Sequence, residues 1–250
     1  MNRDILEKFL NNYLNVYSIA DKSVNGLQVE GSFKIKKIVL SVSYSISVAQ
    51  ETIKNGADTI IVHHGILWNE VEPITSVFKK RIEILIKNNV NLFAYHLPLD
   101  LHPKIGNNVS IIKLFNVYKI KPFGFYKGKA IGFKAKLLHK TPLTKVIETI
   151  KEKINPKPFV LDFGKKEIES LAVISGRASS FLVDAIKEKI DLYITGEPAE
   201  EVFELSRDLN MNFIAAGHYK TEVFGIKNLQ KILEKKFKIQ TLFFDTENPL

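Results

Sequence analysis

Four of the six histidines stand in three short segments that each hold a second residue able to bind a metal ion. The segments read IVHHGILW, YHLPLD and AAGHYKTE, and their candidates are His63, His64, His96, Asp100, His218 and Glu222. The spacing of four between His218 and Glu222 puts both side chains on one face of a helix. Imidazole and carboxylate groups are ligands of divalent transition metals, so these segments predict a metal site. His102 and His139 lack such neighbours and are interpreted as structural.

The three segments come after the ends of three expected strands. Runs of apolar residues predict these strands at 57–62, 91–95 and 212–216. Ligands bind at the carboxyl ends of strands in parallel α/β sheets, so the six side chains can converge. Pro98 cannot donate to a strand ladder, which predicts a loop after the strand at 91–95.

Strands and helices alternate in both halves of the chain. Further strands are expected at 37–43, 170–174 and 191–195, and helices at 46–55, 75–88, 107–114, 179–189, 199–209 and 221–234. Such alternation indicates an α/β class with largely parallel sheets. We predict two α/β subdomains, 1–121 and 170–250, that bracket a small β-rich basic lobe at 122–169, with the metal site in the cleft between the subdomains.

The net charge of +9 is concentrated in the middle of the chain. Counted by residue type, it is +3 over 1–118, +10 over 119–166 and −4 over 167–250. A basic segment could bind DNA or RNA. The favoured alternative is the solvated face of a β-hairpin, with lysines at 127, 129, 134 and 136 and an inner face of Ile131, Phe133 and Ala135.

Composition excludes several kinds of protein. With no cysteine, there can be no disulfide scaffold, thiolate metal site or cysteine nucleophile. The first residues predict an amphipathic helix and not a signal peptide, and no apolar run approaches the ~20 residues of a membrane span. A cytoplasmic protein without membrane partners is therefore expected. P-loop, GxGxxG and HExxH motifs are also absent from the sequence.

Five ordered segments resemble one known family. NGLQVEG, IIVHHGILW, YHLPLDLHPKIGNN, ITGE and AAGHYKTEVFG look like the signature segments of the Nif-three-like family, whose members are also called GTP cyclohydrolase I type 2 homologues. The resemblance spans nearly the whole chain. It implies two divalent metal ions between two α/β subdomains and a ring-shaped homohexamer.

Carried over by motif, the resemblance implies that the metals are bound by His63, His64, Asp100, His218 and Glu222. His96 would be a further ligand or a catalytic acid/base group. The chain departs from the family where an Asp often ends the first strand, here Ser43, and where a His often follows the TGE run, here 198–201. Three imidazoles and two carboxylates suit zinc, iron, manganese or nickel, and the remaining positive charge would favour an anionic substrate.

These observations favour a metal-dependent hydrolase, possible substrates being a nucleotide or another phosphorylated heterocycle. Two alternatives remain open: a hexameric ring that binds nucleic acid and holds structural metals, and a metal-handling protein. The run ISGRASS at 174–180, which includes Arg177, is either a phosphate cradle or an ordinary strand-to-helix turn. Thr195 and Glu197 could line the same cleft or cap a helix.

Overall fold

The computed structural model describes residues 1–70 and 72–250 as two compact α/β units. Unit 1 comprises 1–99 and 225–248, and unit 2 comprises 100–224 and 249–250. The chain passes from one unit to the other within two helices, α4 (Leu97–Asp100) and α9 (His218–Phe237), and once more between Asn248 and Pro249. The expected α/β class with two subdomains is thus confirmed. Among the described residues, no helix is long and apolar enough to cross a membrane.

Unit 1 is built on a five-stranded sheet in the order β1-β4-β3-β2-β11. Its strands are β1 (Gly26–Val29), β2 (Lys37–Ser43), β3 (Thr59–His64), β4 (Asn91–Ala94) and β11 (Gln240–Phe243). All neighbouring strands are parallel except β1, which runs antiparallel to β4. The parallel register aligns Val62 with Ala94, so β3 and β4 end side by side.

The helices of unit 1 are amphipathic, and each packs its apolar face into the interior of the unit. They are α1 (Arg3–Tyr13), α2 (Ile46–Lys54), α3 (Ser76–Lys87) and the later turns of α9. The side chains of Val48 and Leu85, from α2 and α3, pack with Ile60 and Val62 of β3 in one core. Continuous apolar residues in β3 therefore reflect burial on both faces of the sheet.

Unit 2 is built on a six-stranded mixed sheet in the order β5-β6-β8-β9-β10-β7. Its strands are β5 (Val117–Tyr126), β6 (Lys129–Pro142), β7 (Phe159–Asp162), β8 (Glu167–Val173), β9 (Leu192–Thr195) and β10 (Asn212–Ala215). The central strands β8, β9 and β10 are mutually parallel. The largely parallel arrangement expected from alternation therefore holds for unit 1, whereas unit 2 gains antiparallel strands at both edges.

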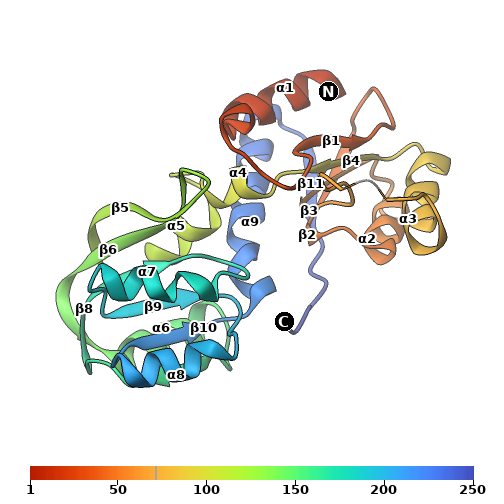
Figure 1. Ribbon diagram of the computed structural model, residues 1–250. Coiled ribbons are helices and arrows are strands. Elements are labelled where there is room, and N and C mark those ends of the chain that lie inside the picture. The colour runs from red at the N-terminus through yellow and green to blue at the C-terminus, as the bar shows by residue number, and fades with distance from the viewer. Residues whose placement is uncertain (71) are drawn as a thin grey trace. The chain divides into compact units, whose positions relative to one another are not determined.

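Helices cover both faces of the unit 2 sheet. They are α5 (Asn107–Ile112), α6 (Leu143–Lys153), α7 (Leu182–Lys187) and α8 (Glu201–Asp208). Alternate residues of β9 point to opposite sides: Leu192 packs with α5 and α6, and Tyr193 packs with α7 and α8. Figure 1 shows α7 and α8 beside β9 and β10.

The basic middle segment joins this sheet. β5 and β6 form the expected hairpin, and Phe133 and Ala135 pack inward with the α5 and α6 core. β6 also pairs with β8 from Phe133 to Lys136 and again near Thr141. The division at 121/122 and 169/170 therefore does not follow the two units. Local alternation predicted the hairpin, but the residues of β8 that pair with its second strand lie about 25 to 40 residues further along the chain.

A buried carboxylate fixes the start of β9. Asp191, whose side chain is 6% exposed, accepts hydrogen bonds from the backbone N–H groups of Glu169 and Ser170, both at 3.0 Å. The Ser170 hydroxyl also donates to it, and Lys165 Nζ lies 2.7 Å from Oδ1. Burial by itself raises the pKa of Asp191, but these donors lower it more, so its pKa falls below the usual value.

We expect Asp191→Asn to destabilise the fold by about 2 kcal/mol, because the amide loses the ion pair and turns a donor toward Lys165. A folded-state pKa below the unfolded value means that this stabilisation is present above about pH 4 and is lost as the pH falls through the folded pKa. Urea unfolding at pH 7 and pH 3 measures the free energy of unfolding of wild type and variant. The difference between the two proteins should be smaller at pH 3 than at pH 7. The exposed Asp162→Asn change is the control and should cost about 0.5 kcal/mol or less. An equal cost for both variants would contradict this assignment.

Candidate metal centre

Unit 1 brings three histidines together. His63 and His64 are the last two residues of β3, whereas the sequence predicted them in the loop after the strand. His96 follows the adjacent strand β4. Ligand nitrogens of all three lie within 4.8 Å of one another. Their ring centroids are 4.5 Å apart for His63 and His64, 5.0 Å for His63 and His96, and 5.5 Å for His64 and His96.

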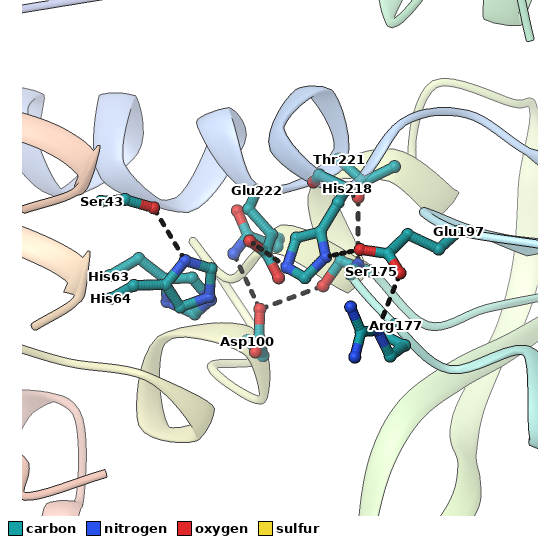
Figure 2. Close-up of polar contacts among 12 residues, drawn as sticks. Ser43, His63, His64, Asp100, Ser175, Arg177, Glu197, His218, Thr221 and Glu222 are labelled. Carbon is teal, nitrogen blue, oxygen red and sulfur yellow. Dashed lines mark hydrogen bonds and ion pairs between the residues drawn. The ribbon is translucent and has the colours of Figure 1, made fainter. Parts of the chain in front are cut away.

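Each of these imidazoles is oriented through its Nδ1 atom. His63 Nδ1 lies 2.9 Å from the carbonyl oxygen of Tyr95, and His96 Nδ1 lies 2.9 Å from Asp21 Oδ1. Because a carbonyl and a carboxylate can only accept, both Nδ1 atoms carry a proton, and in the neutral ring the lone pair is on Nε2. His64 Nδ1 lies 3.0 Å from the Ser43 hydroxyl, shown in Figure 2. This is the pattern of metal-binding histidines, whose second nitrogen is held by an outer partner.

Asp21 was not predicted as a site residue. It stands in the turn-rich stretch before β1 and accepts hydrogen bonds from the backbone N–H groups of Ser23 and Leu97 and from the Asn25 amide. Burial raises the pKa of this carboxyl, but the pairing with His96 and the other donors lowers it far below its usual value. Asp21 is therefore ionised and holds the His96 ring in place.

Unit 2 brings together two carboxylates and a fourth histidine. His218 is the first residue of α9 and Glu222 lies one turn later, with His218 Nε2 3.1 Å from Glu222 Oε2. A carboxylate oxygen of Asp100 lies within 4.8 Å of one of Glu222. Asp100 and Glu222 are only 6% and 3% exposed. Two buried carboxylates this close repel one another, which a cation would relieve.

Side chains from the start of α5 and from the segments after the carboxyl ends of β8 and β9 hold this group in position. Asp100 Oδ1 accepts from Asn107 Nδ2 at 2.7 Å and from Ser175 Oγ at 3.0 Å. Glu197 Oε1 lies 2.5 Å from His218 Nδ1, and its other oxygen accepts from Arg177 Nε at 2.8 Å. Figure 2 shows this chain of contacts. His218 is therefore oriented through Nδ1, like the histidines of unit 1.

Electrostatics favour positive charge at His218. Its burial lowers its pKa, but Glu222 and Glu197 raise it more, to about 9. Their negative charge would equally attract a metal cation. Glu197, for which the sequence left a lining or a capping role open, contacts His218 Nδ1 and so orients the His218 ring. Asn107 and Ser175 were not predicted, although Asn107 lies in a segment that carried the family resemblance.

Gly176 leaves room at this carboxylate. It has a φ of +64°, and a Cβ at this position would lie 2.4 Å from Glu222 Oε1 and 3.3 Å from His218 Nε2. A side chain here would therefore displace the very atoms proposed as ligands. Because Gly176 has no Cβ, the space next to the Glu222 carboxylate and the His218 ring stays open. Imidazole and carboxylate donors suit zinc, iron, manganese or nickel, so these residues fit a divalent metal ion.

The remaining predictions have simpler outcomes. His102 Nδ1 accepts from the backbone N–H groups of Lys104 and Ile105, as expected of a structural residue. The Thr195 hydroxyl donates to the Gly176 carbonyl oxygen and so braces the turn. The loop expected at Pro98 is instead the short helix α4, because proline is well tolerated in a first helical turn.

One protein family and its members match this chain over nearly its whole length. The sequence model of Duf34/NIF3 (NGG1p interacting factor 3) matches residues 1–249. A protein of Pyrococcus abyssi called "GTP cyclohydrolase 1 type 2 homolog" is 40% identical, with all of both chains covered. One of Pasteurella multocida with the same name is 35% identical over the full length of both chains. Similarity therefore includes both units.

Solved structures show the same arrangement of elements. The crystal structure of TTHA1606 from Thermus thermophilus matches with a TM-score of 0.91 at 32% sequence identity, covering all of both chains. Reduced HcgD from Methanocaldococcus jannaschii matches with a TM-score of 0.86 at 27% identity, covering 97% of each chain.

Proposed function

This chain belongs to the Duf34/NIF3 family, and from that premise we propose that it is a hydrolase dependent on two divalent metal ions. The proposed ligands are His63, His64, Asp100, His218 and Glu222. The observation that carries the proposal is the outer support of the imidazoles: Nδ1 of His63 and of His218 is held by an oxygen that can only accept. Bound in pairs, such ions supply Lewis acidity and activate water near neutral pH.

His96 is proposed to move the proton. Its Nδ1 is held by ionised Asp21, so its Nε2 can accept a proton and Asp21 stabilises the resulting imidazolium. The ring lies beside His63 and His64, and its side chain is 21% exposed, which leaves it accessible to a substrate. The same position would also allow it to be a further ligand. The metal content of a His96 variant separates these roles.

Two features support a phosphorylated heterocycle as the substrate class. In unit 1, the Trp68 ring is 36% exposed and lies 5.3 Å from the His96 ring, so a flat aromatic ring could stack on it. In unit 2, Arg177 has a side chain 78% exposed and lines a cavity of about 390 Å³ with Lys157 and Glu197. Its guanidinium could hold a phosphate by paired hydrogen bonds.

The test begins with the metals of the purified protein. Metal analysis should find about two divalent ions per chain, and a hydrolase screen in that metal with nucleotides and phosphorylated heterocycles should find turnover. Metal without turnover on any of these substrates would favour a metal-handling role or a nucleic-acid-binding ring. A protein that retains no metal after loading would overturn the proposal.

The oligomeric state gives a separate prediction. Because members of the resembled family form rings, we propose a homohexamer of the 28.5 kDa chain. Light scattering behind size exclusion should give a mass near six chains over a wide concentration range. A monomer at all concentrations would refute the homohexamer. It would leave the proposed metal ligands untested, because they are assigned independently of the oligomeric state.

A further inference from the structure

Lysines make up half of the residues that line a second pocket in unit 2. It has a volume of about 360 Å³. Its charged residues are Lys119, Lys121, Lys134, Lys136, Lys165, Lys189, Glu169, Glu188 and Asp191. The lining thus carries a formal charge of +3. We propose that this pocket binds a di- or triphosphate group, either free or carried by a nucleotide.

The pocket is distinct from the metal-binding group of unit 2. Glu169 and Ser170 lie in the first half of β8, and Asp191 directly precedes β9. The candidate metal ligands and their supports instead follow the carboxyl ends of these parallel strands, where Ser175 and Glu197 stand. The two sites therefore occupy opposite ends of the same strands.

Pairing of β5 with β6 brings four of the lining lysines close together: Lys119, Lys121, Lys134 and Lys136. Lys121 is paired across the strands with Lys134, and Tyr118 with Lys136. Cross-strand partners share a face of the sheet, and so do residues two apart, so Lys121, Lys134 and Lys136 share one face. The register shifts between Tyr118 and Lys121, where Lys119 has a φ of +53°. Lys119 and Lys121, which stand at this irregularity, both line the pocket.

Carboxylates neutralise only part of this charge. Lys134 pairs with Glu188, Lys165 pairs with Asp191 at 2.7 Å, and Glu169 is engaged by Lys140 at 2.7 Å. Over residues 1–70 and 72–250, no ion pair is found for the other four lining lysines, which are Lys119, Lys121, Lys136 and Lys189. Like charges held together in one pocket repel one another, and a multivalent anion relieves that repulsion.

Shape and charge favour a small anion over a nucleic acid strand. The volume lies within the range of small-ligand pockets. The three carboxylates interrupt the positive lining, whereas a groove that follows a nucleic acid backbone is continuously basic. Adjacent phosphates carry several negative charges within a few ångströms, which matches four clustered ammonium groups.

Calorimetric titration of the full protein with inorganic tripolyphosphate at low salt tests the proposal. We expect Lys121→Gln, Lys136→Gln and Lys189→Gln each to weaken binding about threefold, and the triple variant about thirtyfold. Lys151→Gln, an exposed lysine of α6 outside the pocket, is the matched control and should bind like wild type. Melting curves of the variants confirm that each is folded. Raising the salt concentration should weaken wild-type binding.

Tripolyphosphate also binds metals, so Glu222→Gln is the second control. Retained affinity in Glu222→Gln, together with loss in the triple variant, supports the lysine pocket. Affinity that falls with Glu222→Gln and not with the lysine variants would place the anion at the metal centre and overturn the proposal. Absence of binding, or lysine-dependent binding of a single-stranded oligonucleotide but not of tripolyphosphate, would overturn it as well. ATP and tripolyphosphate compared in parallel show whether the nucleoside adds affinity.

Discussion

Glu222→Gln should reduce the metal content to one ion per chain or fewer and lower hydrolysis by a factor of roughly one hundred or more. The carboxylate is 3% exposed, lies 3.1 Å from His218 Nε2 and is within 4.8 Å of an Asp100 oxygen. Glutamine keeps the shape but removes the negative charge that would neutralise a cation. Metal analysis and initial rates of the same preparation measure the effect.

Glu201→Gln is the matched control, since Glu201 is an exposed residue at the start of α8 in the same unit. It should leave metal content and rate unchanged and alter stability by about 0.5 kcal/mol or less. If Glu222→Gln behaves in the same way and retains two metals per chain, Glu222 is not a ligand.

His96→Gln should lower hydrolysis by a factor of about one hundred or more while leaving two metals bound. The reason is that His96 is assigned to proton transfer, with its ring fixed by Asp21. Asp21→Asn keeps the imidazole but removes the ionised partner that orients it, so a smaller loss of roughly tenfold to a hundredfold is expected. Rate and metal content of both variants, measured together, separate proton transfer from ligation.

His139→Gln is the control for the His96 variant, because His139 is exposed. It should leave the rate of hydrolysis unchanged. A loss of metal in His96→Gln would instead make His96 a ligand. An unchanged rate in His96→Gln would remove it from the chemistry altogether.

Regular patterns predicted the elements that position these residues. The apolar run before His63 predicted a buried strand, and the spacing of His218 and Glu222 predicted a shared helix face. Both are present, although β3 includes its two histidines and α9 begins at His218, three residues before the expected helix. The boundaries shifted because strand pairing and helix capping depend on neighbours that a local pattern does not contain.

Contacts between distant segments were harder to predict. Asp21 holds His96 across 75 residues, and Ser175 holds Asp100 across the same separation. Asp21 has no local pattern that distinguishes it from other polar loop residues, and the run at 174–180 that contains Ser175 predicted a phosphate cradle or a turn, not a contact with Asp100. The edge strands β1, β7 and β11 were also missed, because each pairs with a strand from a distant part of the chain and its own short sequence does not show that pairing.

Anomalous X-ray diffraction from crystals loaded with zinc or manganese would locate the metal ions and identify their ligands. We expect two metal peaks per chain, with ligand atoms of His63, His64, Asp100, His218 and Glu222 about 2.0 to 2.4 Å from one ion or the other. Peaks held by other residues, with these five side chains dispersed, would contradict the proposed ligand set.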